Sequence, residues 1–404
     1  MKRLKFDNPL DCAGCGACVS ICPRHCIEIV KDDLEFNIAR LEHPELCIDC
    51  GMCYKVCPQI KHRDNQKLNS VCVYGQSKLS DQLLESSSGG LFSLLASHIL
   101  DKGGIVWGVE LQRDGWPSFT CIYSKNDLWK IRGSKYSEVK EPLNFQLIKK
   151  QIKEGKLVLV SGTPCQITAL RNFLRNVECS NLILIDLLCY GIQSPKMWHF
   201  YLKDINPKGK KISRVSMRNK HYSWFNYSMK ICFEDGFTYR KIRYKDPWLL
   251  TYSTSMFNRL SCSNCQSKKT PHASDFTIGD FWDIDYYKTS LNISKRYGIS
   301  LGMLHTSKAI ELFSQIKDDF IFDYIPKDYM DRRNISLTQS AKVNPLRESF
   351  IGYVYNFGFS AAVEHYMDSG LSVWYKKRKN YLRRRTVDKI KNFVKKIIHY
   401  KNED

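Results

Sequence analysis

Short apolar runs alternate with amphipathic stretches through the middle of the chain. Such runs, separated by segments with helical periodicity, are typical of a sheet with helices packed on it. The pattern predicts strands at Val71–Tyr74, Ile105–Leu111, Phe119–Tyr123, Leu157–Ser161 and Leu182–Leu188. It predicts helices at Gly90–Leu100, Phe145–Lys153 and Cys165–Leu174. We therefore expect a mixed α/β domain over this region.

After residue 210 the pattern becomes rich in strands. Strands are predicted at Ile212–Met217, Tyr227–Phe233 and Phe237–Tyr239, and Asp235 with Gly236 supplies a hairpin turn. Later strands are expected at Asp275–Ile278 and Ile299–Leu304. The expected fold class is therefore α/β (α+β overall), with a strand-rich C-terminal part.

Length and composition are those of a globular protein with two or three domains. The chain has 404 residues, of which 43% are hydrophobic and 12% aromatic. The charges of Met1–Asp7 are followed by no apolar stretch, and no apolar run has the length of a membrane span. Seventeen cysteines without an export signal favour a reducing compartment. We therefore expect a cytoplasmic protein.

The net charge of +21 is uneven along the chain, and about +9 of it lies in the last 29 residues. Residues 376–404 hold twelve Lys or Arg and three acidic residues. Apolar residues recur between them at helical spacing: Val387, Ile390, Phe393, Val394, Ile397 and Ile398. A basic amphipathic helix suits an acidic partner or peripheral contact with an anionic membrane such as the inner membrane face, and a solvated terminal helix is equally compatible. No nucleic-acid-binding motif accompanies the charge, so we expect no nucleic-acid partner.

Eight cysteines near the N-terminus form two runs with the same spacing. Each run reads C-x2-C-x2-C-x3-C-P, at residues 12–23 and 47–58. Bacterial-type ferredoxins use this spacing to hold two 4Fe–4S clusters, and the fourth cysteine of each run ligates the other cluster. We assign the ligands of one cluster to Cys12, Cys15, Cys18 and Cys57. We assign those of its partner to Cys22, Cys47, Cys50 and Cys53.

The residues between these cysteines support the same interpretation. Gly14, Gly16 and Gly51 permit the positive φ that tight turns around a cluster need, and the proline after each run fixes the exit of the chain. A disulfide framework or a zinc site is the alternative, but disulfides suit small secreted chains and zinc ligands normally occur as CxxC pairs. Because such clusters transfer single electrons, part of the function is electron transfer. Cys26 is interpreted as a buried apolar residue.

Two polar stretches are candidates for binding a cofactor. The run Ser86–Gly90 leads into a predicted helix, where hydroxyls and backbone amides can bind phosphate or pyrophosphate. A simple helix cap is the alternative interpretation of this run. The segment Arg132–Tyr136 can present one cation and one aromatic ring. Neither stretch is specific by itself.

Four further cysteines are candidates for a third cluster. Cys165 follows one buried strand and Cys189 ends the next, so both can face the crevice beyond the carboxyl ends of the strands. With the CxxC pair Cys262 and Cys265 they make the four thiols that a 4Fe–4S cluster requires. The alternative is a redox dithiol or a zinc half-site at 262 and 265, with the other two cysteines merely buried.

Together these segments resemble the family of coenzyme F-420 hydrogenase/dehydrogenase beta subunits, which also contains chlorophyll reductases and formate dehydrogenase beta subunits. The matching segments keep the family's order over about residues 70–350: SSGGLF at 87–92, RGSKY at 132–136, SGTPCQITALRNFL at 161–174, DLLCYGIQSP at 186–195, and RLSCSNCQ with SDFTIGDFWD at 259–283. GTPCQ and IGDFW are the specific signals, and SSGG alone is not.

The resemblance implies a flavoprotein with FAD in the α/β domain and a 4Fe–4S cluster beside it. By position, Cys165, Cys189, Cys262 and Cys265 fall on the family's cluster cysteines. The residues that fall on its flavin-contacting stretches are Ser87, Ser88, Gly89, Gly90, Ser134 and Lys135. One departure is Tyr190, which stands where the family commonly has His. This departure weakens any inference about the substrate.

The resemblance also implies a division into domains. We expect a two-cluster ferredoxin domain at 1–62, the two parts of the beta-subunit-like domain at 70–205 and 206–350, and a basic helical tail at 351–404.

The expected function is that of an iron–sulfur flavoprotein oxidoreductase. Electrons pass between the N-terminal clusters, a third cluster and FAD in either direction, and on to a coenzyme F-420-like or other small acceptor. Because relatives occur beside surface-polysaccharide genes, a sugar-linked acceptor is an alternative. A non-catalytic subunit that relays electrons to a partner protein and a membrane-surface scaffold are the other hypotheses. No catalytic acid or base is assigned, and Asp280 and Asp283 are expected to be structural.

Overall fold

The computed structural model describes residues 8, 12–60, 70–268, 272–285 and 287–366. The chain divides into two compact units, residues 1–347 and 348–404, which are described separately. The basic tail at 376–404 lies outside the described residues. In the described part of the chain, every helix is too short or too polar to cross a lipid bilayer.

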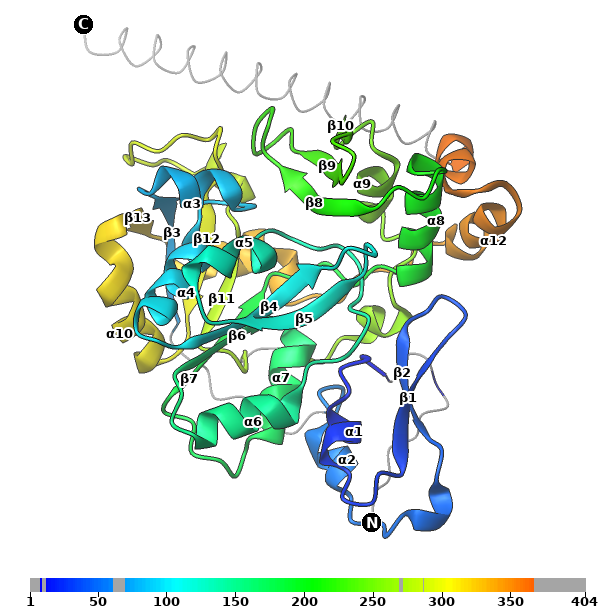
Figure 1. Cartoon of the computed structure of the whole chain (residues 1–404). Helices are drawn as coiled ribbons and strands as arrows, with labels where there is room; N and C mark the ends of the chain where they lie inside the picture. Colours follow the sequence, from blue (N-terminus) through cyan, green and yellow to red (C-terminus); the bar gives the residue numbers. More distant parts are fainter. Residues whose placement is uncertain (1–7, 9–11, 61–69, 269–271, 286, 367–404) are drawn as a thin grey trace, which may run out of the picture. The chain divides into compact units, whose positions relative to one another are not determined.

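An eight-stranded mixed sheet forms the centre of the described part of the first unit, in the order β13-β3-β12-β11-β7-β6-β4-β5 (Figure 1). Its strands are β3 (Val71–Ser77), β4 (Ile105–Leu111), β5 (Pro117–Ile122), β6 (Val158–Gly162), β7 (Leu182–Leu187), β11 (Phe276–Asp280), β12 (Ser300–Leu304) and β13 (Phe320–Tyr324). Strands β4, β6, β7 and β11 run parallel, and the others pair antiparallel. The predicted α/β class is confirmed, and each predicted strand of this region overlaps an observed one.

Helices cover both faces of this sheet. The helices α4 (Leu91–Asp101) and α10 (Ser307–Ile316) pack on one face, and α6 (Phe145–Lys153) and α7 (Pro164–Phe173) pack on the other. Side chains alternate between the faces along each strand, so Leu159 packs with α4 whereas its neighbour Val158 packs with α6 and α7. Two-sided burial explains why these strands read as continuous apolar runs.

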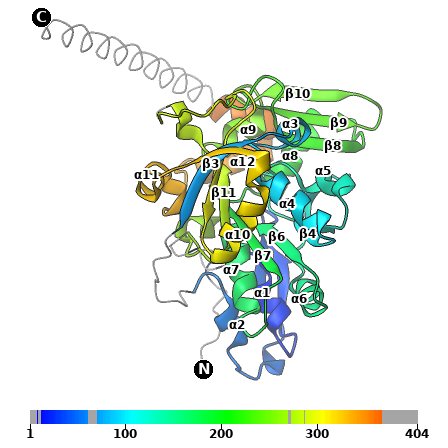
Figure 2. The same ribbon diagram turned by 90° about the vertical axis from the view of Figure 1, so that its left-hand side faces the viewer.

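A separate three-stranded antiparallel sheet accounts for the strand-rich stretch after residue 210 (Figure 2). It consists of β8 (Ile212–Asn219), β9 (Ser228–Phe233) and β10 (Thr238–Ile242). The remaining helices of the first unit are α3 (Ser80–Glu85), α5 (Leu128–Ile131), α8 (Pro195–Ile205), α9 (Pro247–Tyr252) and α11 (Lys327–Arg333). The sequence pattern predicted none of these five helices.

The N-terminal cysteine module contains two short helices and a hairpin: α1 (Ala17–Ile21), β1 (Ile27–Lys31), β2 (Asn37–Leu41) and α2 (Met52–Val56). Gly16 and Gly51 precede the two helices with φ of 75° and 67°, which confirms the expected need for glycine. Both helices contact α7, and Cys15 and Cys18 share a core with residues of α6 and α7. The module is therefore packed on the α/β domain.

The second unit is described over residues 348–366. Helix α12 (Arg347–Phe357) spans the boundary between the two units. Within the second unit, Phe350 packs against Phe359 with ring centroids 6.1 Å apart, and Tyr353 stacks on His365 with centroids 4.5 Å apart. These aromatic contacts hold the described residues of this unit together.

Candidate redox site

The first predicted set of N-terminal thiols lies at the inner side of the module. Burial raises the pKa of Cys15, and the neighbouring Cys18, Cys57 and Cys165 raise it further. Burial also raises the pKa of Cys18, with further contributions from Cys12 and Cys57. Because these electrostatic effects require proximity, the structure places the first run beside the fourth cysteine of the second run. This arrangement fits the predicted ligand set, and it places that set next to Cys165.

The second predicted set surrounds a small cavity. The cavity is lined by all four thiols of the set, Cys22, Cys47, Cys50 and Cys53. Ile48, which also lines it, is 60% exposed, so this side of the module faces solvent. The buried Cys26 lies against the same cavity, and its backbone N–H donates to Cys22 Sγ at 3.4 Å. A hydrogen bond to a cluster sulfur is one means of tuning its potential.

The third predicted set is brought together from three parts of the chain. Burial raises the pKa of Cys165, and Cys265, Cys189 and Cys262 raise it further. Burial followed by the charge of Cys189 raises the pKa of Cys262 to about 12. Cys165 lies in the first turn of α7, where Thr163 and Gln166 form a capping box. The ligand role of the four thiols stays a prediction, but their proximity fits it.

All seventeen cysteines lie in the described part of the chain and carry thiols rather than disulfides. Among the described residues, no three or more His, Cys, Asp or Glu converge tightly enough to hold a single metal ion. A 4Fe–4S cluster has a different requirement, because four thiolates bind the cluster as a whole.

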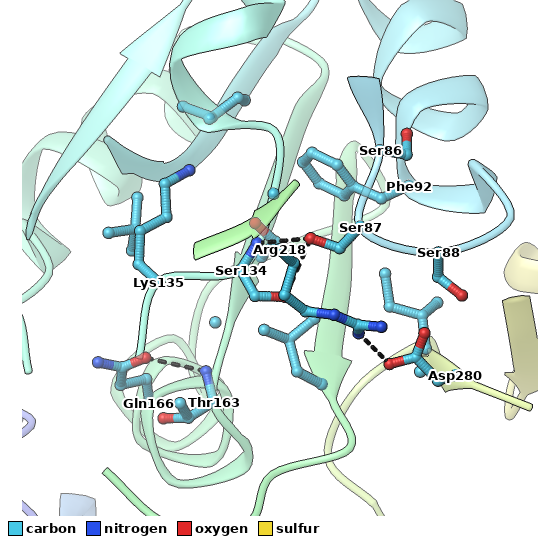
Figure 3. Close-up of a pocket in the computed structure, with 18 of the residues that line it drawn as sticks. Ser86, Ser87, Ser88, Phe92, Ser134, Lys135, Thr163, Gln166, Arg218 and Asp280 are labelled. Atoms are coloured by element: carbon cyan, nitrogen blue, oxygen red, sulfur yellow. Dashed lines mark hydrogen bonds and ion pairs between the residues drawn. The ribbon is translucent and has the colours of Figure 1, made fainter. Parts of the chain in front are cut away.

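A cavity of about 210 Å³ lies beyond the carboxyl ends of the parallel strands β6, β7 and β11 (Figure 3). A cavity that holds a single water needs a volume of roughly 10–15 Å³, so this space suits an organic group of many atoms. Its wall includes Cys165, Ala13 of the N-terminal module, and residues of β8 and α4. The cavity therefore adjoins both the third thiol set and the first cysteine run.

Five of the six predicted cofactor residues line this cavity: Ser87, Ser88, Gly90, Ser134 and Lys135. The sixth residue, Gly89, is packed between β3 and β12, where a Cβ atom would meet Gly75 O at 2.4 Å and Ser300 N at 2.5 Å. Close packing of the backbone, and not a place in the cavity wall, therefore explains a glycine at position 89.

The two polar stretches meet at a hydrogen bond. Ser87 Oγ accepts from the backbone N–H of Ser134 at 2.8 Å and lies 3.2 Å from its Oγ. Ser88 Oγ donates to Ile299 O at 2.9 Å. Helix α4 follows Gly90, which has φ of 91°, and has no side-chain cap. The serines therefore join loops at the cavity wall and do not cap the helix, so the simple helix-cap interpretation is wrong.

Lys135 is a weaker cation than the sequence suggested. Its Nζ donates to the backbone oxygens of Arg132 at 2.7 Å and Lys130 at 3.2 Å. Burial lowers the pKa of this ammonium to about 7. Its charge at neutral pH is therefore partial, and its donors are directed at carbonyl groups.

Arg218, a residue that sequence reasoning missed, lies at the cavity wall from strand β8 (Figure 3). It donates to Asp280, which also accepts from Trp224 Nε1 at 2.7 Å. The rings of Tyr227 and Trp282 lie 4.7 Å and 5.0 Å from its guanidinium carbon. Burial acts to lower its pKa, but Asp280, Tyr136 and Tyr227 together outweigh that effect and the pKa is raised. Arg218 is therefore the permanently charged cation of the wall, and Asp280 holds it in place.

A buried ion pair joins the N-terminal module to the α/β domain. Arg259 Nη2 donates to both carboxylate oxygens of Glu138, at 2.5 Å and 2.6 Å. It also donates to Asn37 O at 3.0 Å, while Nη1 donates to Cys12 O at 3.2 Å. Arg259 lies three residues before Cys262 and donates to Cys12 O, so it connects the first and third thiol sets. No sequence signal marked this contact, because its members are far apart in the chain.

A second buried polar network supports the strand ends. Asp186 accepts a hydrogen bond from Thr277 and lies 2.9 Å from His272 Nδ1. Thr277 Oγ1 lies 2.8 Å from His305 Nε2, and the two imidazoles stack with centroids 5.1 Å apart. Burial lowers the pKa of His305 to about 4. The network orders β7 and β11 just before Cys189.

Tyr190 is 44% exposed and does not line the cavity. Its backbone oxygen accepts from Asn258 Nδ2 at 3.2 Å. The structure therefore gives no proton-transfer role to the residue at which the chain departs from the resembled family.

Comparison with known proteins tests the resemblance. Residues 155–328 match the family model for the C terminus of the coenzyme F420 hydrogenase/dehydrogenase beta subunit, and residues 11–61 match a 4Fe-4S dicluster domain. The expected resemblance to these beta subunits, with a 4Fe–4S dicluster domain at the N-terminus, is confirmed.

Two curated relatives are similar to part of the chain. The F subunit of the F(420)H(2) dehydrogenase of Methanosarcina mazei is 26% identical over 187 residues, covering 44% of this chain and 53% of the relative. An uncharacterized protein of Methanocaldococcus jannaschii is 29% identical over 192 residues, covering 40% and 52%. The chain thus spans about half the length of these relatives.

A chain of the F420-reducing [NiFe] hydrogenase complex from Methanosarcina barkeri is similar with a TM-score of 0.44 and 17% identity. The alignment covers 69% of this chain and 90% of that one.

Proposed function

We propose that this chain is an FAD-containing iron–sulfur oxidoreductase that exchanges electrons between its N-terminal clusters and a small acceptor. The single observation that carries the proposal is the cavity wall. It places Cys165 of the third thiol set, Ala13 of the first cysteine run, and Ser87, Ser134 and Lys135 around one space. Bound there, 4Fe–4S clusters supply single electrons and a flavin interconverts one-electron and two-electron chemistry.

The protein's own residues would order these groups along one line. The cavity lined by Cys22, Cys47, Cys50 and Cys53 lies beside the exposed Ile48, so this set would exchange electrons with the outside. The set with Cys15 lies next to Cys165, and Cys165 lines the large cavity. Electrons could therefore pass through the three sites in this order. The predicted domain boundaries at 62, 205 and 350 belong to the same proposal.

The acceptor is proposed as coenzyme F-420 or another small molecule, with a sugar-linked acceptor as the alternative. The coenzyme is proposed because the matching family and the Methanosarcina mazei relative carry its name. That relative is named as a subunit, which also supports the second candidate function, electron relay to a partner protein.

Anaerobic purification with iron, sulfide and flavin measured together tests the proposal. The expected content is about twelve irons and one FAD per chain, since three clusters hold four irons each. Cys165→Ala should lower the iron by about one third and leave the signals of the N-terminal pair. The matched control is Cys232→Ala, a half-buried thiol on β9 outside the three sets, which should keep all the iron.

Unchanged iron in the Cys165→Ala protein would contradict the third cluster. Absence of flavin with full iron would favour the relay subunit. Reduction of a small acceptor by the FAD-loaded protein would favour the enzyme, and reduction that occurs only when a partner protein is added would favour the relay.

A further inference from the structure

The large cavity has two chemically different sides. One side carries Thr163, Cys165 and Gln166 at the start of α7. The other carries Ser88, Arg218 and Asp280, and Figure 3 shows Arg218 and Asp280 well apart from Thr163 and Gln166. If the proposed flavin occupies the cavity, its ring belongs on the Cys165 side, because the protein must position the reactive part of a cofactor against its electron donor. The phosphate end of the cofactor then falls on the Arg218 side.

Arg218 has unused hydrogen-bonding capacity on that side. It is 5% exposed, and only Nη1 donates to Asp280, while Nε and Nη2 have no hydrogen-bond partner among the described residues. Those two nitrogens form the edge of a guanidinium that binds phosphate or carboxylate with two parallel hydrogen bonds. A buried donor pair without a partner is costly, so an anionic partner would stabilise it.

Helix α4 contributes a second, independent donor on the same side. It is eleven residues long and begins at Leu91 after Gly90, which has no side chain to cap it, although the N–H of Leu91 makes a long hydrogen bond to Ser300 Oγ at 3.5 Å. Gly90, Leu91 and Phe92 all line the cavity. The later N–H groups of the first turn and the positive end of the helix dipole together favour phosphate.

The charges around the cavity agree with an anionic occupant. The two carboxylates in the wall are already engaged, Glu138 by Arg259 and Asp280 by Arg218. Lys135 adds a partial cation whose hydrogen bonds go to backbone carbonyl oxygens. Because both carboxylates are paired with arginines, they repel an anion in the cavity only weakly.

We propose that Arg218 and the start of α4 form a phosphate-binding subsite that recognises the diphosphate of a dinucleotide cofactor. The inference rests on the proposed flavin, because the diphosphate is that of FAD. Asp280, Tyr227 and Trp282 act as positioning residues that hold the guanidinium at the cavity wall. Arg218 would thus select FAD over flavins that lack the diphosphate.

Binding of FAD and of riboflavin to the anaerobically purified, flavin-depleted protein tests this subsite. Riboflavin has the ring but no phosphate. Arg218→Gln should weaken FAD binding about 10- to 100-fold, measured by quenching of flavin fluorescence, and change riboflavin binding by less than about threefold. Arg218→Lys keeps the positive charge but cannot make two parallel hydrogen bonds. It should therefore bind FAD more tightly than Arg218→Gln and less tightly than the wild-type protein.

The matched control is Arg214→Gln on the same strand, which removes an exposed arginine paired with Glu85 and should change neither affinity. FAD affinity that is unchanged in Arg218→Gln, or that falls together with riboflavin affinity, would overturn the subsite. If the wild-type protein binds neither flavin, the proposed function fails, and inorganic pyrophosphate then decides the subsite. A rise in the unfolding temperature of the wild-type protein with pyrophosphate, absent in Arg218→Gln, would keep it, and no rise would overturn it.

Discussion

The N-terminal module and the third thiol set both bring candidate cluster ligands together, but they take them from the chain in different ways. The module takes eight candidate ligands from residues 12–57, in two short runs with fixed spacing. The third set takes four from residues 165–265, on the start of α7, the end of β7 and a CxxC segment. In the module the local chain determines where the thiols lie. In the third set the sheet determines it, because parallel strands place their carboxyl ends at one edge.

The two regions therefore depend on different parts of the structure. Loosening the tertiary packing should disturb the third set first, and local backbone changes should disturb the module first. The contacts that join the regions, chiefly Arg259 with Glu138, should matter to both.

The largest effect is expected when the junction between the regions is broken. Arg259→Met leaves Glu138 buried without its counter-charge and removes the hydrogen bonds to Asn37 O and Cys12 O. Breaking a buried pair in this way lowers the free energy of unfolding by about 3–5 kcal/mol. Chemical denaturation with iron release as a second signal measures it.

The matched control is Arg332→Met. Its ion pair with Asp328 has side chains 73% and 68% exposed and should contribute no more than about 1 kcal/mol. Equal losses in the two variants would contradict the role of the junction.

A smaller effect is expected from acid, and it should act on the sheet that carries the third set. Burial holds the pKa of His305 at about 4 in the folded protein, below the usual value of about 6.5. Between these two values the unfolded chain binds more protons than the folded one, so stability falls as the pH falls. His305 alone accounts for as much as about 3 kcal/mol over this window.

His305→Gln should therefore flatten the dependence of the unfolding free energy on pH between about 6.5 and 4. His272 acts in the opposite direction, because Asp186 raises its pKa despite burial. The exposed His221→Gln is the control and should leave the slope unchanged. A slope that is identical in His305→Gln and the wild-type protein would show that this histidine is not responsible.

The smallest effect is expected from a local change in the module. Gly16 has φ of 75°, and a Cβ atom there would meet Pro142 Cβ at 2.6 Å. Gly209 has φ of 60° and nothing within 4 Å. Both Gly→Ala changes strain the backbone by roughly 1–2 kcal/mol, and Gly16→Ala should destabilise by about 2 kcal/mol more because of the contact.

Thermal unfolding of the two alanine variants, with the iron content of each, measures the difference. Gly209→Ala should keep all its iron, whereas Gly16→Ala should lose iron from the N-terminal pair before the third set. Equal stability of the two variants would show that the module tolerates a shift against Pro142.

Much of the fold could be predicted because its signals are local. The apolar run at Leu182–Leu188 and the amphipathic stretch at Phe145–Lys153 correspond to β7 and α6. Helix α8 was missed although its start carries a local signal, the N-cap Ser194 followed by Pro195, and its apolar residues recur at helical spacing. The cavity wall was predicted in part, since Ser87 and Ser134 lie in recognisable stretches, whereas Arg218 lies in a strand without a motif.

The sequence by itself determined the ligand spacing of the N-terminal module, the α/β class and the resemblance to the beta subunits, because these depend on residues within one turn or strand of each other. Only the tertiary structure decided that Arg218 is a charged residue of the cavity wall and that Arg259 links Glu138 to Cys12. It also decided that Lys135 is buried, which lowers the pKa of its ammonium to about 7. The reason is that the burial and charge of such groups depend on partners distant in the chain, which the fold alone brings into contact.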